Sequence, residues 1–260
     1  MRYGYWMIIS SVFAVSAAAG QPIVEVTDFS LKDPGRSDKV KTQIFLPGHK
    51  KKVNTVLLSP DWLEPGKQGL KQAQSFARML AARGWAVVLM QHQDTKARID
   101  DRKNWKRRAM DAGFLVNILP WREALLPQVL GRMDTTKFAV VGIGAGGFAA
   151  LALAGAELQD RKLFGLFSFK DDRVGAFAAI QPPGEGSFGL HAGSWGSLGS
   201  GAILLADCPG VKNDSGNGKK IFDRISTGKN RVYYQEKSPK CESSPTLIEK
   251  LDQFLRLNSR

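Results

Sequence analysis

A glycine-rich turn between two apolar segments is the stretch of this sequence whose residue types and spacing point most directly to chemistry. Residues 138–153, FAVVGIGAGGFAALAL, predict a buried strand, a glycine turn and an Ala/Leu-rich helix. In a parallel sheet, such a junction is where ligands are held. Gly142, Gly144 and Gly147 complete the G-x-G-x-x-G pattern of a dinucleotide site. The turn also fits the G-x-S-x-G elbow that presents a nucleophile, with glycine in place of the serine, over Gly142, Ile143, Gly144, Ala145 and Gly146.

The most basic stretch of the chain, residues 96–108, is a second feature with chemical potential, because it could bind an anion. It holds seven Lys or Arg residues against two Asp residues. Cationic groups interleaved with aromatic side chains suit an anionic amphiphile, a glycan or a phosphorylated partner. A solvated loop and helix face is the alternative interpretation. The residues expected to take part in binding are Trp62, Lys96, Arg98, Arg102, Lys103, Trp105, Lys106, Arg107 and Arg108.

The first 20 residues predict a secretory signal peptide. Arg2 precedes an apolar stretch over residues 6–19, and this stretch ends in small residues. A buried N-terminal helix or an uncleaved anchor is the alternative, but the stretch is short for a membrane span and no other stretch could cross a bilayer. We therefore expect an exported protein, periplasmic or secreted, with no transmembrane span after cleavage and a single domain over residues 21–260.

Composition limits the size of the fold and the kind of partner. With 260 residues, 43% of them hydrophobic and 23% charged, the chain can build one ordinary globular domain. The formal net charge of +13 favours anionic partners such as lipid headgroups, acidic glycans, nucleic acid or acidic proteins. Export disfavours nucleic acid among these partners.

The cysteines and histidines predict a disulfide and no metal site. The chain has two cysteines, Cys208 and Cys241, and an even number favours their pairing in an oxidising compartment. Two cysteines and three scattered histidines, His49, His92 and His191, do not build a Cys/His metal site. We therefore expect neither a metal nor a cofactor.

Two leading strands are followed by strands that alternate with helices. Residues 23–29 and 40–45 predict an antiparallel start. Apolar residues recur at helical spacing over residues 70–81 and in a closing helix that begins with Ser244 as N-cap and Pro245 as its first residue. This order implies a mostly parallel sheet covered on both faces. Further strands are expected at residues 55–59 and 85–90, from residue 138, and at residues 174–180, 202–206 and 231–235, with helical segments after residue 108 and over residues 121–130.

These features resemble the secreted α/β-hydrolases of the dienelactone hydrolase, cutinase and polyester hydrolase type over nearly all of residues 21–260. Residues 59–62, SPDW, are similar to the loop that supplies an oxyanion-hole amide, and residues 134–137, DTTK, are similar to the lead-in to the elbow. The resemblance implies an α/β-hydrolase fold, with a mostly parallel eight-stranded sheet and helices on both faces. It favours the elbow over the dinucleotide site, because at least four strands precede the turn. It also places Cys208 and Cys241 where several members have a disulfide.

Ester hydrolysis in the family that the chain resembles requires an elbow serine, an acid after a later strand and a histidine after the last strand. Gly144 supplies no nucleophile, and residues 236–260 contain no histidine. Asp207 and Asp214 are the candidates for the acid. Asp61 stands where the oxyanion loop is expected to have glycine, and its carboxylate would repel a developing oxyanion. The sequence is also similar to a proteobacterial group of exported, hydrolase-like proteins of unknown function that has glycine at the elbow.

Catalysis with a relocated base is the remaining route to activity. His92 has Asp94 two positions away, and His191 shares a Gly/Ser-rich loop with Ser194, so each histidine is a candidate base. Ser59 is interpreted as the end of a strand. We therefore predict a non-catalytic α/β-hydrolase-fold protein that binds or scaffolds an anionic partner. The alternatives are a carboxylic-ester hydrolase with an unorthodox site and, less favoured, a dinucleotide-binding protein that uses Gly142, Gly144 and Gly147.

Overall fold

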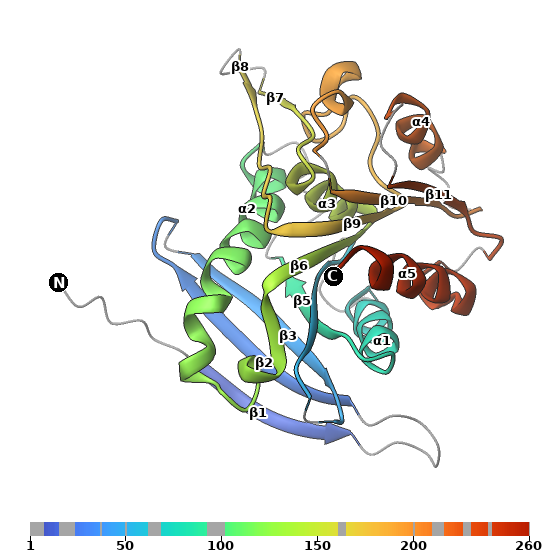
Figure 1. Cartoon of the computed structure of the whole chain (residues 1–260). Coiled ribbons are helices and arrows are strands. Elements are labelled where there is room, and N and C mark those ends of the chain that lie inside the picture. The colour runs from blue at the N-terminus through green and yellow to red at the C-terminus, as the bar shows by residue number, and fades with distance from the viewer. Residues whose placement is uncertain are drawn as a thin grey trace.

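One sheet of nine strands forms the centre of the molecule, in the order β1-β2-β3-β5-β4-β6-β9-β10-β11 (Figure 1). The structure is a computed structural model, and it describes residues 8–15, 24–36, 38–49, 51–61, 69–92, 102–160, 165–199, 201–209, 216–225, 230–238 and 241–259. The strands of the sheet are β1 (Ile8–Val15), β2 (Val24–Asp33), β3 (Asp38–Pro47), β4 (Val53–Ser59), β5 (Ala86–Gln91), β6 (Met133–Ile143), β9 (Val174–Ile180), β10 (Ala202–Asp207) and β11 (Arg231–Gln235).

The sheet is parallel from β5 to β11 and antiparallel at the edge formed by β1, β2 and β3. The predicted sheet of eight mostly parallel strands is confirmed, with β1 as a ninth strand. β1 lies inside the segment that the sequence predicts as a signal peptide, and that peptide stays a prediction. The strand order places β4 between β5 and β6, so the carboxyl ends of these three strands are neighbours.

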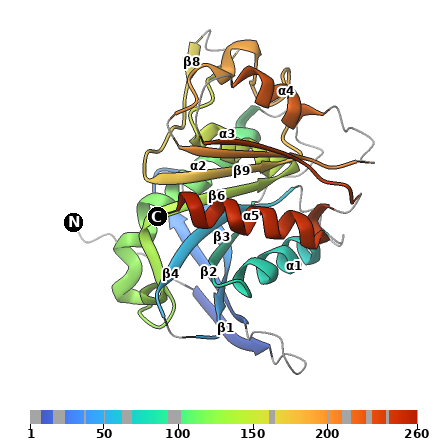
Figure 2. The same ribbon diagram turned by 45° about the vertical axis from the view of Figure 1, so that its right-hand side comes forward.

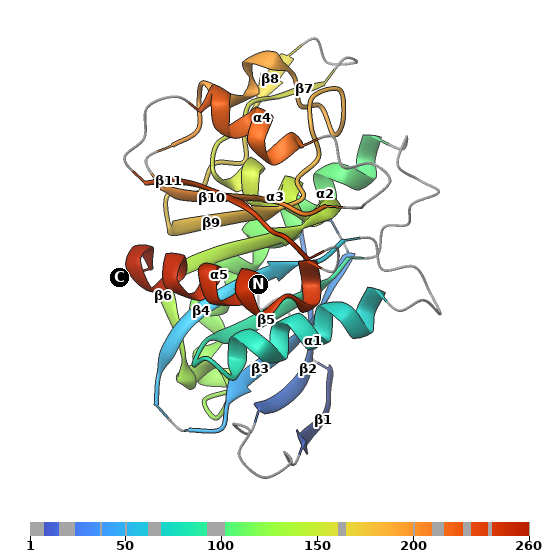
Figure 3. The same cartoon turned by 90° about the vertical axis from the view of Figure 1, so that its right-hand side faces the viewer.

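Helices cover both faces of the sheet. The helices are α1 (Gly69–Ala81), α2 (Arg102–Ile118), α3 (Gly147–Leu153), α4 (Asn217–Arg224) and α5 (Pro245–Asn258). Figure 1 shows α2 and α3 on one side of the sheet, and Figure 3 shows α1 and α5 side by side on the other. Two buried apolar clusters follow this division, one beneath α2 and α3 and one beneath α1 and α5. Each face of the sheet therefore has its own core.

The apolar spacing of the two covering helices explains how they dock. In α1, Ala73, Phe76, Ala77 and Leu80 fall on one face and are buried, as their helical period predicts. α5 begins with Ser244 as N-cap, whose hydroxyl oxygen accepts a hydrogen bond from the Leu247 N–H at 3.3 Å. Both helices confirm the sequence interpretation.

The segment that joins α2 to β6 differs from its expected form. Residues 121–130 were expected to be helical, but two short 3₁₀ helices, Leu119–Leu125 and Leu130–Arg132, stand in this segment. Pro120 and Pro127 lack the N–H that α-helical hydrogen bonding requires, which accounts for the short 3₁₀ turns.

A small two-stranded ladder, β7 (Leu158–Asp160) and β8 (Gly165–Phe167), has no counterpart among the predicted elements. Figure 2 shows it at the same end of the molecule as α4. Its strands of three residues are too short to give a recognisable alternation of apolar and polar residues. Among the described residues, no helix is long and apolar enough to cross a membrane.

The predicted disulfide between Cys208 and Cys241 is confirmed, with 5.9 Å between the two Cα atoms. It ties the segment after β10 to the segment that leads into α5. Both cysteines are buried within the core beneath α1 and α5. The bond therefore fixes the last strands of the sheet to the helix that covers them.

Glu236, directly after β11, is a buried carboxylate that organises the start of α5. Its oxygens accept hydrogen bonds from the Ser244 and Thr246 hydroxyls and from the Ser238 and Lys237 N–H groups. Burial opposes ionisation, but these hydrogen bonds lower the pKa of Glu236 to about 2 from its ordinary value of 4.5. The ionised carboxylate is therefore part of the folded state at neutral pH.

We expect Glu236→Gln to lower the free energy of unfolding by about 2 kcal/mol at pH 7, the usual loss for hydrogen bonds to a charged group. Because the folded pKa is depressed, the stabilisation is complete above pH 4.5 and shrinks as the pH falls toward 2. Urea unfolding of both proteins from pH 7 to pH 3 would measure this. Glu249→Gln, on the exposed face of α5, is the matched control with little expected change. An equal loss at pH 7 and pH 3 would contradict the prediction.

Candidate functional site

The glycine turn after β6 forms a tight elbow between the strand and α3. Gly144 has φ +54°, in the left-handed region, and begins the short turn Gly144–Gly146. A Cβ on Gly142 would lie 2.1 Å from the Gly146 carbonyl oxygen, and one on Gly146 would lie 1.9 Å from the Ser59 carbonyl oxygen. These glycines allow the main chain of the turn to pack directly on the end of β4.

The Asp61 carboxylate occupies the place where an elbow nucleophile would project. A Cβ on Gly144 would lie 2.4 Å from Asp61 Cγ and 2.6 Å from each carboxylate oxygen. Asp61 Oδ1 also accepts a hydrogen bond from the Ala145 N–H at 2.9 Å. That N–H belongs to the residue after the nucleophile position, which is the usual oxyanion donor of such an elbow. The elbow therefore has neither a nucleophile nor an unoccupied Ala145 amide.

A serine, a histidine and an aspartate form a hydrogen-bonded relay beside the elbow. Ser59 Oγ lies 2.9 Å from His92 Nε2, and His92 Nδ1 lies 2.8 Å from Asp111 Oδ2. Ser59 is the last residue of β4, His92 follows β5, and Asp111 belongs to α2. All three residues are buried, and Ser59 is 0% exposed. The order of contacts, hydroxyl to imidazole to carboxylate, is that of a catalytic triad.

Arg36, in the turn between β2 and β3, fixes the acid end of the relay. Its Nη2 donates to Asp111 Oδ1 at 2.8 Å, and its Nε donates to Asp33 Oδ2 at 2.6 Å. Burial would raise the pKa of Asp111, but hydrogen bonding and charge from His92 and then Arg36 lower it below its ordinary value of 3.8. Asp111 is therefore ionised and can only accept hydrogen bonds.

The ionised Asp111 determines the tautomer of His92. Because the carboxylate only accepts, His92 Nδ1 must carry the proton and donate it. In neutral His92, Nε2 is then the acceptor for the Ser59 hydroxyl. This arrangement is the one in which an imidazole removes a proton from a serine.

The sheet and one face of α2 position these side chains. Leu57 on β4 and Met90 on β5 belong to the core beneath α2 and α3, and alternation along a strand turns Ser59 and His92 toward the same face. Arg108, one helical turn before Asp111, is also buried, and its Nη1 donates to the Pro60 carbonyl oxygen at 2.5 Å. α2 therefore holds both the relay and the loop that carries Asp61.

The sequence interpretation missed Asp111, Arg36 and the hydroxyl of Ser59. Ser59 does end its strand, as interpreted, but its hydroxyl is hydrogen bonded to His92. The structure supplies a partner for His92 from α2, while Asp94, its neighbour along the chain, lies outside the described residues. One signal was present in the sequence: Arg108 and Asp111 fall at the same helical spacing as the buried Ala112 and Leu115.

The other predicted acid and base residues have structural partners. The Asp207 oxygens accept the Gly218 N–H at 2.9 Å and the Lys219 N–H at 2.8 Å, so Asp207 binds the first turn of α4. Asp214 lies outside the described residues. His191 Nδ1 accepts the Gly193 N–H at 3.2 Å, and Ser194 Oγ accepts the His191 N–H at 2.8 Å. The His191 and Ser194 side chains are therefore bonded to main chain and not to each other.

The predicted anion-binding residues are only partly described. Trp62, Lys96 and Arg98 lie outside the described residues, and of Arg102, Lys103 and Trp105 only the backbone, in α2, is described. Lys106 Nζ stands 4.6 Å from the centre of the Phe167 ring, and Arg107 is half-buried. Arg108, which the sequence also predicts to bind an anion, is 0% exposed and donates to the Pro60 carbonyl oxygen. Anion binding by this basic stretch stays a prediction.

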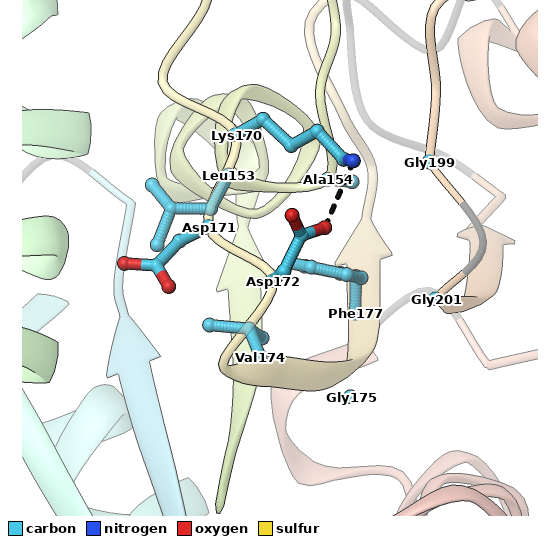
Figure 4. Close-up of a pocket in the computed structure, with 10 residues that line it drawn as sticks. All are labelled: Leu153, Ala154, Lys170, Asp171, Asp172, Val174, Gly175, Phe177, Gly199 and Gly201. Atoms are coloured by element: carbon cyan, nitrogen blue, oxygen red, sulfur yellow. Dashed lines mark ion pairs between the residues drawn. The ribbon is translucent and has the colours of Figure 1, made fainter.

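A pocket of about 130 Å³ lies at the amino ends of the parallel strands, beside β9 (Figure 4). Val174 and Gly175, at the amino end of β9, line it, and Lys170 Nζ forms an ion pair of 2.8 Å with Asp172 Oδ1 across it. Ser59 is at the carboxyl end of β4, which is parallel to β9, so the pocket is remote from the relay. Among the described residues, no group of three or more His, Cys, Asp or Glu side chains could hold a metal ion.

Comparison with known proteins identifies the fold. No protein-family model matches the chain, and no curated protein matches it. Among solved structures, a cold-adapted esterase from an Arctic intertidal metagenomic library has a TM-score of 0.62 at 12% identity, covering 94% of this chain and 100% of its own. A variant of esterase rPPE has a TM-score of 0.59 at 11% identity, with 95% and 86% covered. An S-formylglutathione hydrolase from Agrobacterium tumefaciens has a TM-score of 0.60 at 12% identity, with 95% and 98% covered.

Identities this low carry the fold and not the activity. The nine-stranded, mostly parallel chain superposes on these neighbours over most of each chain. The chain therefore has the α/β-hydrolase fold.

Proposed function

We propose that this protein is a serine-type ester hydrolase whose acyl-transfer site is the relay of Ser59, His92 and Asp111 and not the elbow at Gly144. The observation that carries the proposal is the pair of hydrogen bonds through His92, 2.9 Å to Ser59 and 2.8 Å to Asp111. Solved proteins of the same fold that are named esterases support this class of reaction. The relay supplies the nucleophile and base that the elbow lacks.

The relay can carry out both halves of ester hydrolysis. His92 Nε2 takes the hydroxyl proton as Ser59 Oγ bonds to the ester carbonyl carbon, and it gives that proton to the departing alcohol as the ester bond breaks. A water then attacks the acyl-serine in the same way and releases the acid. Asp111 holds the imidazolium that forms in each half. Because Ser59 is buried, an ester must displace the groups that cover its hydroxyl before it can react.

Export and a disulfide-permissive compartment are part of this proposal. The bond between Cys208 and Cys241 supports an oxidising environment, in agreement with the predicted signal peptide over residues 1–20.

A non-catalytic protein that binds an anionic partner is the second candidate. The absence of an elbow nucleophile and the complete burial of Ser59 favour it. The net charge of +13 supports an anionic partner, such as a lipid headgroup, a glycan or an acidic protein. The two candidates differ in whether Ser59 reacts.

Covalent labelling of Ser59 is the test. The purified protein is treated with p-nitrophenyl acetate and, separately, with methanesulfonyl fluoride, and mass spectrometry locates the adduct. We expect turnover of the ester and an adduct on Ser59, both abolished by Ser59→Ala. Ser194→Ala is the matched control, because Ser194 is also 0% exposed and is next to a histidine in space, but its oxygen accepts a main-chain N–H.

Failure has a definite meaning in this experiment. If the protein neither turns over the ester nor forms a Ser59 adduct, the hydrolase proposal is wrong. Salt-sensitive binding to vesicles that contain an anionic lipid would then support the second candidate. Turnover that survives Ser59→Ala but is lost in Ser194→Ala would move the site to the loop of His191.

A further inference from the structure

The elbow turn and the relay are in direct main-chain contact. Ser59 pairs with Gly142 in the β4–β6 ladder, and the Ser59 carbonyl oxygen packs against Gly146 closely enough to exclude a Cβ there. Ala145 lies in the turn between these two glycines. Its N–H is therefore held next to the strand end that carries the relay serine.

The Asp61 carboxylate accepts a hydrogen bond from this N–H. Asp61 belongs to the loop after β4, and the main chain of that loop is held at Pro60, one residue earlier. The Arg108 guanidinium holds the Pro60 carbonyl oxygen, while Asp61 itself is exposed. Its carboxylate lies against Gly144 and accepts from Ala145 N at 2.9 Å. The side chain can therefore leave the turn by rotating into solvent, without movement of β4.

A carboxylate oxygen in this position carries the negative charge that an ester carbonyl oxygen acquires in the transition state. Acyl transfer to Ser59 places negative charge on the carbonyl oxygen, and a main-chain N–H that receives it accelerates such reactions by roughly 10²–10³-fold. The Asp61 carboxylate both accepts from the Ala145 N–H and repels the negatively charged acyl oxygen that would replace it there.

We propose that the Ala145 N–H is the acyl-oxygen donor for Ser59 and that Asp61 is its internal occupant, whose departure limits turnover. This inference rests on the proposed function of the relay. The elbow then has a role although it has no nucleophile of its own. It supplies the Ala145 N–H donor, and the neighbouring strand β4 supplies the serine.

Two independent ways of removing the carboxylate test the inference. Asp61→Ala removes the occupant, and we expect kcat for p-nitrophenyl acetate to rise about 10- to 100-fold. Gly144→Ala keeps Asp61 but places a Cβ 2.4 Å from its Cγ, which displaces the carboxylate, so we expect a rise here as well. The double variant should be no faster than the faster single variant, because both changes free the same N–H.

Two further variants distinguish occupancy of the Ala145 N–H from the charge of Asp61, and both from the general effect of removing a carboxylate. Asp61→Asn keeps an acceptor of the same size on the Ala145 N–H without its charge, and we expect a rise of only a few-fold. Asp172→Ala removes an exposed carboxylate just before β9, at the opposite end of the parallel strands from Ser59, and should leave the rate unchanged. The rate of Ser59 labelling by methanesulfonyl fluoride should follow kcat through the whole series.

The outcomes distinguish this inference from the function on which it rests. If the unaltered protein forms the Ser59 adduct but Asp61→Ala is no faster, or is slower, Asp61 is not the occupant and only this inference is overturned. If the unaltered protein neither turns over the ester nor forms a Ser59 adduct, the hydrolase function and the inference fail together. A rise in Asp61→Asn equal to that in Asp61→Ala would show that charge and not occupancy is responsible, which also overturns it.

Discussion

An Asp111→Asn variant should lose ester turnover by about 10³–10⁴-fold, as expected when the acid of a triad becomes an amide. The Asn amide group can donate to His92 Nδ1, which moves the imidazole proton to Nε2. Nε2 then no longer accepts the Ser59 hydroxyl, and the base is lost although the side chain keeps its size. Steady-state kinetics with p-nitrophenyl acetate would measure the loss.

The same variant should lower the free energy of unfolding by about 3 kcal/mol, because the Arg36 guanidinium loses one of its two carboxylate partners. Arg36 would keep only Asp33 as an anionic partner among the described residues. Since the folded pKa of Asp111 is depressed, the stabilisation is complete above its ordinary value of 3.8 and is lost as the pH falls through the folded value. Urea unfolding at pH 7 and pH 3 would measure this difference.

Asp172→Asn is the control for both measurements. Asp172 is an exposed carboxylate paired with Lys170 beside the amino end of β9, remote from the relay. It should change neither turnover nor stability by more than a small amount. Turnover in Asp111→Asn within tenfold of the unaltered protein would contradict the assigned role of Asp111, whatever its stability.

Loss of the disulfide should have the second large effect. Cys208 and Cys241 are 33 residues apart, and closing a loop of this length stabilises the folded state by about 3–4 kcal/mol through the entropy of the unfolded chain. We expect a variant with both Cys208→Ala and Cys241→Ala to unfold about 10 °C lower than the oxidised protein. Thermal unfolding followed by circular dichroism would measure the shift.

The relay should be unaffected in those molecules of the variant that remain folded. No relay residue packs against the disulfide, which lies in the core beneath α1 and α5, whereas the relay faces α2. Turnover of p-nitrophenyl acetate per folded molecule should therefore equal that of the oxidised protein. A fall in stability of less than 1 kcal/mol would contradict the expected loop-closure effect.

The sheet could be predicted from the sequence because most of its strands are separate runs of apolar residues. β9 and β11 coincide with their expected residues, and β4 and β10 differ by one or two positions. A buried parallel strand needs only apolar side chains on both faces, which is a local property. The same holds for the apolar face of α1.

The relay could not be predicted because its partners meet only through the sheet order. Ser59 and His92 are neighbours because β4 pairs with β5, and their separation in sequence gives no indication of this. Arg108 is predicted from the sequence to bind an anion because it follows other cations, and α2 turns it and Asp111 toward the core. Asp61 was expected to oppose an oxyanion, and the structure adds that its carboxylate already holds the Ala145 N–H.

The positions of the relay residues along the chain also bear on how the protein matures. Arg36, Ser59, His92 and Asp111 all precede the elbow, whereas Cys208 follows β10 and Cys241 precedes α5. Because synthesis proceeds from the N-terminus, every relay side chain emerges before either cysteine. The disulfide can therefore form only after every relay residue has been synthesised, so oxidation is the last of these steps that can begin.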